Sequence, residues 1–173
     1  NPKEIVFLQL IDDEYWEWSE HSEMISKFSP LITQVESNKF PSEFNEQDFQ
    51  LIEEIPGARF LTNAEVVKRF TEVDVFINIP LIKHHGTTLI TGALKNIMGI
   101  CTRKTNVGFH LGSGEKNDPG YLGQCIADIN LLRRPDLVVA DATELIINNG
   151  PGGPGDMVTP DTIIVSESPL AVD

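Results

Sequence analysis

The sequence predicts an α/β fold in which a mostly parallel, doubly wound sheet lies between two layers of helices. From Ile55 onward, short β-branched runs alternate with stretches of helical periodicity and with Gly- or Pro-bearing turns, which is the pattern of βαβ units. The runs Leu137–Asp141 and Thr162–Val165 are apolar at nearly every position, as expected of strands that helices cover on both faces. The chain has 173 residues, of which 40% are hydrophobic, so its size and composition predict one folded domain and exclude a disordered polymer.

Local patterns predict the elements of the first half of the chain. Ile5–Ile11 is apolar at most positions and predicts a strand. Ala64–Phe70 predicts a short helix. Val73–Ile79 predicts a second strand, which ends at Pro80 because proline cannot donate to a sheet ladder.

Capping residues predict two longer helices. Thr87 or Thr88 can cap a helix that runs through Met98, and the glycine that follows Met98 would end it in a left-handed conformation. Asp118, followed by a proline, predicts the start of a helix that covers residues 121–132 and ends at a basic Arg-Arg-Pro run. Together the elements predict a three-layer Rossmann-like arrangement whose sheet is incomplete within this chain.

Composition divides the chain at Ile55. Residues 1–54 hold an acidic, aromatic segment in which Trp16 and Trp18 lie within a run of Asp and Glu. We interpret this segment as a solvated cap, and the alternative is a motif that binds a protein partner. Residues 55–173 then form the α/β domain.

The charge and the cysteines exclude several functional classes. The formal charge is −13 and the pI about 4.6, so we expect neither nucleic acid nor an anionic membrane surface as the main partner. No apolar run reaches the roughly 18 residues of a membrane span, and no leader is visible. Cys101 and Cys125 lack a C-x-x-C pattern, so we expect buried free thiols, with no iron–sulfur cluster and no cysteine-ligated zinc.

A basic island lies in the middle of this acidic chain. The 40 residues between Asp74 and Glu115 contain no Asp or Glu, where the average composition would place about six. The cationic and imidazole side chains of this stretch are Lys83, Lys95, Arg103, Lys104, His84, His85 and His110. Such an island focuses the electrostatic field on anions, which predicts a small anionic partner.

The island spans a predicted strand-to-helix turn, which is where open α/β sheets bind ligands. The first free N–H groups of the helix at Thr87 would face the crevice. The predicted ligand-binding residues are Lys83, Gly86, Thr87, Thr91, Gly92, Lys95 and Asn96. Their donors suit a carboxylate or a phosphate, whereas the G-x-x-x-x-G-K-[ST] spacing of a nucleoside triphosphate loop is missing.

Three histidines and one aspartate are the candidates for proton transfer. His84 and His85 are adjacent, so in an extended segment their side chains diverge, and we expect only one of them to face the ligand. We predict that one of His84, His85 and His110 moves a proton and that Asp141 orients it. The alternatives are packing histidines, a turn bond at Asp141, and a metal held by a histidine with His110 and Asp141, although no H-x-x-x-H spacing supports a metal.

Two polar features of the sequence fit a role in a binding site and a purely structural role equally well. Residues 148–156 contain four Gly and two Pro, so they form a loop that is either a lid or static. Asn78 and Asn96 lie within apolar elements and either order the site or bond within the core. This loop and the N-terminal segment are the candidate surfaces for a protein partner.

Several ordered motifs extend across the α/β part of the chain. They are the stretches 73–80, 83–85, 91–99, 126–130, 134–137, 139–143, 149–151 and 168–173. This set resembles the bacterial and archaeal family catalogued as domain of unknown function 362. The resemblance covers residues 55–173 and implies a fold more than a function, because the reaction of the family is not established.

The resemblance implies further expectations. Many similar members are exported with twin-arginine leaders, which favours a periplasmic or extracellular location over a cytoplasmic one. Others carry ferredoxin-type cysteines, which this chain lacks. The first portion of the family is not visible before Ile55, and Ser168 stands where the closing motif usually has Asp, so we expect a fragment or a divergent member.

A shorter likeness covers 15 residues. His85, followed by Thr91-Gly92, Lys95 and Gly99, is similar to the His, Gly and Lys motif of nickel-pincer lactate racemases. This analogy would imply that a histidine removes a proton beside a carboxylate that Lys95 holds.

These patterns lead to three hypotheses. The first is a protein, enzymatic or not, that binds or transforms a small carboxylate or phosphate at the Lys/His-rich crevice. The second is a non-catalytic interaction module, and the third is a His-ligated metal site. No motif predicts a particular cofactor.

Overall fold

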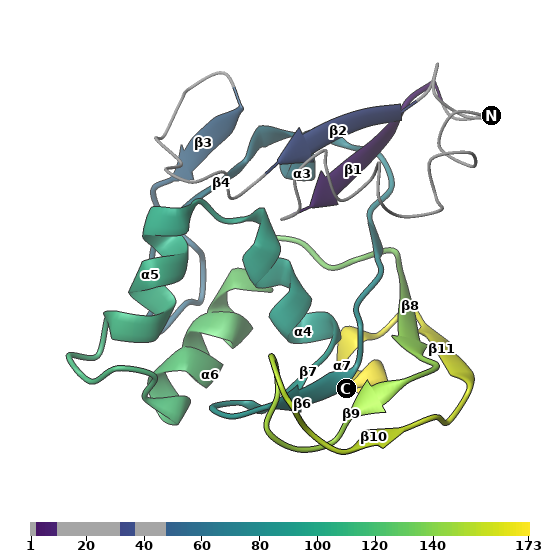
Figure 1. Cartoon of the computed structure of the whole chain (residues 1–173). Helices are drawn as coiled ribbons and strands as arrows, with labels where there is room; N and C mark the ends of the chain where they lie inside the picture. The colour runs from purple at the N-terminus through teal and green to yellow at the C-terminus, as the bar shows by residue number, and fades with distance from the viewer. Residues whose placement is uncertain (1–2, 10–31, 37–47) are drawn as a thin grey trace.

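The computed structural model of the chain describes residues 3–9, 32–36 and 48–173 (Figure 1). Its strands are β1 (Ile5–Gln9), β2 (Ile32–Glu36), β3 (Phe49–Ile52), β4 (Ala64–Val67), β5 (Ile77–Asn78), β6 (Lys83–His85), β7 (Leu89–Thr91), β8 (Leu137–Ala142), β9 (Leu145–Ile146), β10 (Met157–Val158) and β11 (Thr162–Ser166). Its helices are α3 (Lys68–Glu72), α4 (Ala93–Asn96), the 3₁₀ helix η2 (Ile97–Ile100), α5 (Arg103–Leu111), α6 (Pro119–Ile129) and α7 (Pro169–Val172). Trp16 and Trp18 lie outside the described residues.

The largest described sheet has three strands in the order β11–β8–β5. β5 runs parallel to β8, whereas β11 runs antiparallel to it. The segment between β8 and β11 carries β9, β10 and a Gly/Pro loop but no helix, and a strand that returns without a helical crossover pairs antiparallel. The mixed α/β class is therefore confirmed, but the described residues form several small sheets in place of the expected mostly parallel, doubly wound sheet.

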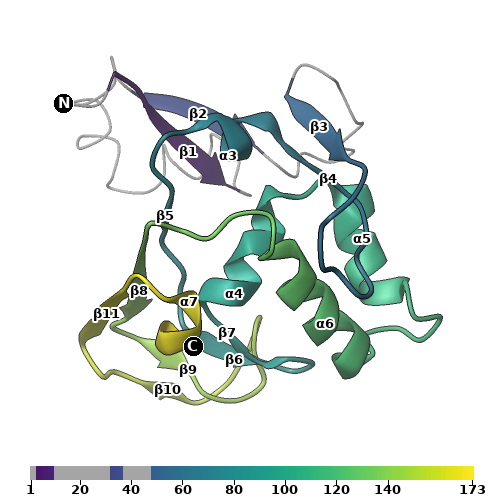
Figure 2. The same ribbon diagram turned by 180° about the vertical axis from the view of Figure 1, so that it is seen from behind.

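Helices cover one face of the three-stranded sheet. Buried and half-buried residues alternate along β8. The buried residues Val138 and Ala140 pack with Ala93 of α4 and Val172 of α7. Figure 2 shows α7 next to α4, beside β8 and β11. This face is the second, smaller hydrophobic cluster of the described chain.

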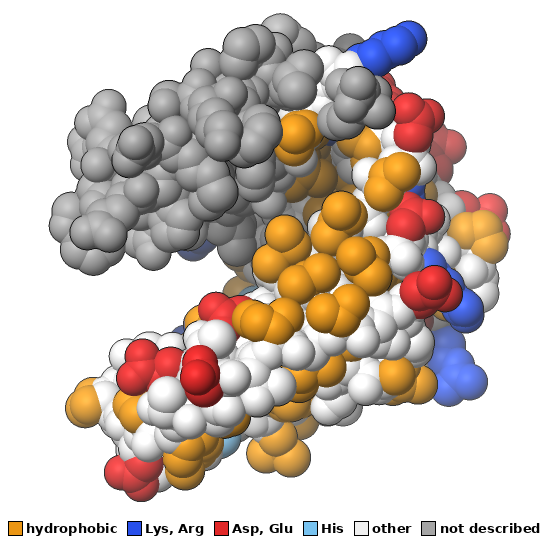
Figure 3. Space-filling view, turned by 90° about the vertical axis from the view of Figure 1, so that its right-hand side faces the viewer, with side chains coloured by type: hydrophobic (Ala, Val, Ile, Leu, Met, Phe, Trp, Pro, Cys, Tyr) orange, Lys and Arg blue, Asp and Glu red, His pale blue; other side chains and the backbone are white. Residues whose placement is uncertain are grey.

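The opposite face of the same sheet carries exposed apolar side chains. Paired residues share a face, as do residues two apart on one strand, and the register therefore groups the exposed Ile77, Ile163 and Val165 with the half-buried Leu137 and Val139. Figure 3 shows hydrophobic side chains gathered on the side of the molecule that carries β8 and β11. Among the described residues, helices therefore do not cover both faces of the sheet, although the sequence predicts such coverage. The prediction goes too far because an apolar strand shows which faces avoid water and not which segment packs on them.

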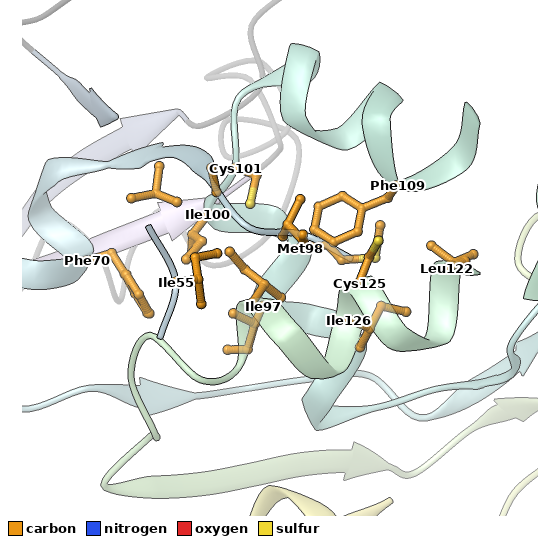
Figure 4. Close-up of a cluster of buried hydrophobic side chains, with 14 residues drawn as sticks. Ile55, Phe70, Ile97, Met98, Ile100, Cys101, Phe109, Leu122, Cys125 and Ile126 are labelled. Atoms are coloured by element: carbon orange, nitrogen blue, oxygen red, sulfur yellow. The ribbon is translucent and has the colours of Figure 1, made fainter. Parts of the chain in front are cut away.

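The main hydrophobic core lies between β4, η2, α5 and α6 (Figure 4). Phe70, Ile97 and Phe109 are among its fully buried side chains. Cys101 and Cys125 are also buried and form no disulfide, as predicted. Burial raises the pKa of the Cys101 thiol to about 12, so this thiol stays protonated and unreactive near neutral pH.

The prediction of a helix over residues 64–70 is wrong for its first half. β4 occupies residues 64–67, all of them buried, and pairs antiparallel with β3, so that α3 begins only at Lys68. Because β3 lies before Ile55, this pairing also crosses the boundary that composition predicts. A strand partner distant in sequence overrides local helix propensity here.

β5 contains two residues, whereas the pattern predicts a strand over 73–79. Arg133 donates hydrogen bonds to the carbonyl oxygens of Phe70 at 3.1 Å and Val73 at 2.7 Å. These bonds satisfy carbonyl groups at and after the end of α3 and hold the segment before β5 in a non-strand conformation. The basic run after α6 therefore binds a different helix from the one that its sequence position suggests.

The predicted helix that starts at Thr87 is a β-hairpin. β6 and β7 pair antiparallel around a turn at residues 86–88, and the Thr88 hydroxyl donates to the carbonyl of Ile90 at 2.9 Å. The helix begins only at Ala93, and Gly99 lies within η2 and does not stop it. The Thr and Ile residues of this stretch favour an extended backbone, and their partner strand is directly adjacent in sequence.

The predicted start of α6 is confirmed. The Asp118 carboxylate accepts hydrogen bonds from the backbone N–H of Gly120 at 2.8 Å and of Tyr121 at 3.0 Å, and Pro119 occupies the first helical turn. The 11 residues of α6 rise only about 16 Å. No helix of the described chain is long and apolar enough to cross a bilayer.

Candidate functional site

A pocket of about 570 Å³ opens between the β6–β7 hairpin, the α4–η2 segment, α5 and the loop before α6. It brings together six of the residues that the sequence singles out. They are Lys83, His85, Thr91, Lys95, Asn96 and His110. The remaining candidates, His84, Gly86, Thr87, Gly92 and Asp141, do not line it.

The pocket lining is rich in cations. Lys83, Lys95, Arg103 and Lys116 line it, and no Asp or Glu of the described chain does. Burial lowers the pKa of Lys95, and the positive charge of Lys83 lowers it further. Like charges held together in this way are stabilised by an anion placed between them.

His85 is held by the turn of the hairpin. Its Nδ1 accepts hydrogen bonds from the backbone N–H of Thr87 at 3.2 Å and of Thr88 at 3.3 Å. Burial lowers the pKa of His85, and the charges of Lys95, His110, His84 and Lys83 lower it further. Thr87 thus contributes a donor to the histidine, whereas the sequence predicts that Thr87 binds the ligand at a helix start.

His110 is held by a residue that sequence reasoning missed. Its Nδ1 lies 2.8 Å from Oδ1 of Asn117, and the backbone N–H of Asn117 donates to the carbonyl of His110 at 2.8 Å. Asn117 adopts a left-handed backbone with φ of 60°, which asparagine tolerates better than most residues. Both side chains line the pocket.

Two further polar side chains connect the pocket to the core. Oγ1 of Thr91 is buried and has no hydrogen-bond partner within the described chain. The Asn96 amide donates to Oδ1 of the buried Asn78 at 2.7 Å, and Asn78 donates to the carbonyl of Ala93 at 2.8 Å. Asn78 thus has a structural role and anchors Asn96. The hydroxyl of Thr91 lies at the pocket wall.

His84 points to the Gly/Pro loop, as expected for the neighbour of His85 on a strand. Its Nδ1 accepts the backbone N–H of Gly150 at 3.0 Å, and the N–H of Gly86 donates to the carbonyl of Gly150 at 3.1 Å. A Cβ at Gly150 would lie 2.0 Å from the carbonyl oxygen of His84. The backbone at Gly150 therefore lies close to the hairpin of the same chain, and the next residue, Pro151, lines the pocket.

The N-terminus of α4 is already occupied. The Asp173 carboxylate accepts the N–H of Ala93 at 2.5 Å and of Leu94 at 2.9 Å. A Cβ at Gly92 would lie 2.2 Å from this carboxylate, so Gly92 makes room for Asp173. The N-terminus of α4 is therefore not available to an anionic ligand. This corrects the prediction that Gly92 is a ligand-binding residue.

Asp141 forms the turn bond that was the alternative to a site role. Its Oδ1 accepts from the backbone N–H of Thr143 at 2.9 Å and from the Thr143 hydroxyl at 2.7 Å. These two bonds lower the pKa of Asp141. Because the carboxylate faces its own turn, it does not orient either histidine of the pocket.

The geometry does not favour a metal. Among residues 3–9, 32–36 and 48–173, no three or more His, Cys, Asp or Glu side chains come together as a metal-binding group. The His84 ring bonds to the Gly/Pro loop, and Asp141 bonds to Thr143. The alternative ligand set of a histidine with His110 and Asp141 is therefore not assembled.

α5 carries a signal that the sequence analysis did not use. Arg103, Asn106 and His110 lie at spacings of three and four residues, which places them on one helix face, and all three line the pocket. Lys116 lies just beyond the acid-free stretch and lines the pocket as well. A search for polar residues at helical spacing within the basic island would have found the α5 wall.

Comparison with known families decides the relationship of the chain. The family model described as "Domain of unknown function (DUF362)" matches residues 26–173. The chain belongs to the DUF362 family. The match begins well before Ile55, where the sequence analysis places the start of the resemblance. The pocket, both of its histidines and the whole three-stranded sheet lie inside the part that matches DUF362.

One relative of this DUF362 chain is a thylakoid-associated protein of Synechocystis sp.. The two are 27% identical over 106 residues, which cover 58% of this chain and 32% of the relative. The chain thus spans about a third of the length of that relative.

Proposed function

We propose that this DUF362 chain binds a small anion with two or more negative charges, either a carboxylate or a phosphate, in the pocket between the β6–β7 hairpin and α5. One observation carries the proposal. In a chain with a formal charge of −13, a pocket lined by four Lys or Arg side chains contains no carboxylate among its described lining.

The lining supports a ligand with an organic body. Met98, Val107 and Leu111 contribute apolar surface beside the cations. The volume of about 570 Å³ lies within the range of roughly 300–1,000 Å³ that is typical of small-molecule sites. A small phosphorylated or dicarboxylic compound has the matching size, charge and apolar part.

The burial of Lys95 supports its role as the central anion-binding group. Its ammonium is partly removed from water and lies near the charge of Lys83, and no acidic side chain of the described chain forms an ion pair with it. A bound anion would supply the missing opposite charge. A charge-assisted hydrogen bond of this kind contributes about 1.5–3 kcal/mol.

Calorimetric titration tests this proposal with inorganic phosphate and malonate as probes and uncharged malonamide as the control. We expect at least one of the two anions to bind, with an affinity that falls as salt is added, and malonamide not to bind. Lys95→Met should weaken binding about 10–100-fold. The matched variant Arg134→Met removes an exposed charge outside the pocket lining and should bind as the wild type does.

Either of two results would refute the proposal. One is the absence of binding by both anions at low salt. The other is equal affinity of the wild type and Lys95→Met, which would place the anion elsewhere on the molecule. If the anions do bind, the ratio of the phosphate and malonate affinities identifies the preferred acid group.

A further inference from the structure

The two histidines of the pocket are held through the same ring atom but by opposite kinds of partner. Nδ1 of His85 faces two backbone N–H donors, whereas Nδ1 of His110 faces the amide oxygen of Asn117, an acceptor. We propose that the pocket binds its anion with a fixed division of roles, in which His85 remains a neutral hydrogen-bond donor and His110 takes up a proton. This inference rests on the proposed function and specifies its chemistry.

The contacts of His85 determine where its proton lies. A neutral imidazole carries one N–H, and the nitrogen that accepts hydrogen bonds must be the other one. Because Nδ1 accepts from Thr87 and Thr88, the proton of His85 is on Nε2. Protonation of Nδ1 would break both bonds and set an N–H group against two others. The hairpin turn therefore opposes a charged His85 and leaves Nε2–H as a donor for a ligand.

The contact of His110 has the reverse consequence. An amide oxygen accepts and never donates, so Oδ1 of Asn117 requires the proton of His110 on Nδ1. The lone pair is then on Nε2. Protonation of Nε2 leaves the bond to Asn117 intact, because Nδ1 keeps its proton in the imidazolium. His110 can accordingly gain a proton without any change in its contacts.

The charges that face the two rings explain why the proton is coupled to the anion. Lys83, Lys95, Arg103 and Lys116 line the same pocket, and like charges held close together repel one another. A bound dianion reverses this effect, since it stabilises an added positive charge nearby. The proton comes from solvent and goes to Nε2 of His110, the ring whose contacts allow it, while His85 donates Nε2–H to an oxygen of the anion. A fixed donor beside a proton acceptor is the pair of groups that acid–base chemistry on a bound anion uses.

Long-range ¹H–¹⁵N correlation spectra of the tag-free chain report the tautomer of each histidine directly. Near pH 8 we expect the Nε2–H form for His85 and the Nδ1–H form for His110. Asn117→Ala should release His110 from the Nδ1–H form and leave the His85 signals unchanged. The inference is overturned if His85 shows the Nδ1–H form, if His110 shows the Nε2–H form, or if Asn117→Ala changes neither.

Calorimetry with sulfate, which does not titrate near neutral pH, separates the two roles. Titrations in buffers of different ionisation enthalpy give the number of protons that the protein takes up on binding. His110→Gln should abolish most of the uptake. His85→Gln should weaken binding roughly tenfold, as expected for the loss of one hydrogen bond to a charged group, and should leave the uptake in place. Arg134→Met, which removes an exposed charge outside the pocket lining, serves as the control.

The outcomes distinguish the inference from the proposed function. If no anion binds but the two tautomers are as stated, the proposed function fails and the arrangement of the histidines stands. If sulfate binds without proton uptake, or if His85→Gln abolishes the uptake, the division of roles is wrong although the anion site is correct.

Discussion

The carboxylate of Asp173 accepts a hydrogen bond from the backbone N–H of Ala93 at 2.5 Å. This bond joins α7 to the first turn of α4 on the covered face of the three-stranded sheet. It also explains why the N-terminus of α4 is not open to a ligand, since the chain supplies its own anion there.

Asp173→Asn tests this cap. The amide keeps one acceptor oxygen but loses the charge and one of the two bonds to α4, so we expect a loss of about 0.5–2 kcal/mol in the free energy of unfolding. Urea denaturation measures it. Asp161→Asn, an exposed change outside this contact, should cost much less, and equal losses would contradict the cap.

Asp128→Asn tests a buried carboxylate that holds the loop before β4. Burial disfavours its charged form, but hydrogen bonds from the backbone N–H of Phe60 and Leu61 outweigh burial and lower the pKa of Asp128 below 3.8. The two bonds measure 2.7 and 2.9 Å. The amide oxygen can accept both bonds but lacks the charge that strengthens them, and the NH₂ group takes the place of the oxygen that accepts from Gln124 at 2.8 Å, so we expect about 1–3 kcal/mol of lost stability at neutral pH.

The same site predicts a pH dependence of stability. A carboxylate with a depressed folded-state pKa contributes stability that is complete above its unfolded pKa and is lost as the pH falls through the folded value. The wild type should therefore lose this contribution at acid pH below 3.8. In urea midpoints measured from pH 7 to acid, the difference between wild type and Asp128→Asn should narrow as the pH falls, and a constant difference would contradict the assignment.

Val138→Ala and Val165→Ala compare the two faces of the three-stranded sheet. Val138 is 0% exposed against α4 and α7, and Val165 is 58% exposed on the opposite face. Removing two buried methyl groups should cost roughly 2 kcal/mol at Val138, and the exposed change should cost less than about 0.5 kcal/mol. Chemical denaturation of both variants measures the costs, and similar values would show that both faces are packed.

Gly150→Ala tests the contact between the Gly/Pro loop and the hairpin. A Cβ at Gly150 would lie 2.0 Å from the carbonyl of His84, so we expect the loop to shift, with a loss of about 1–3 kcal/mol. Pro151 would move away from the pocket and the phosphate or malonate affinity should fall. Gly152→Ala, where a Cβ meets nothing within 4 Å, is the matched control and should bind as the wild type does.

Sequence patterns were reliable where the cause is local. The Asp118 cap depends on residues two and three positions away, and the alternation of faces along β8 follows from strand geometry alone. The stretch without carboxylates is likewise a property of the composition, and it supplies most of the pocket lining. The mixed α/β class and the membership of DUF362 are also legible without coordinates.

Patterns were unreliable where a distant segment takes part. Residues 64–67 form a strand because β3 pairs with them, and β11 runs antiparallel because no helix connects it to β8. Asp141 is a different case, because the sequence fits a catalytic carboxylate and a turn bond equally well, and the two bonds from the nearby Thr143 show that it forms the turn bond. Asn117 gives no signal by itself, since its role exists only through the ring of His110.

The sequence by itself therefore determines the charge distribution, the caps and the alternation of buried positions, because these follow from residue type and neighbours within one or two turns. Only the tertiary structure decides which cations share a pocket and which group is placed against the ring of His110. The reason is physical. A tautomer follows from the donor or acceptor placed against the ring, and for His110 that partner is presented by a loop beyond the end of its own helix.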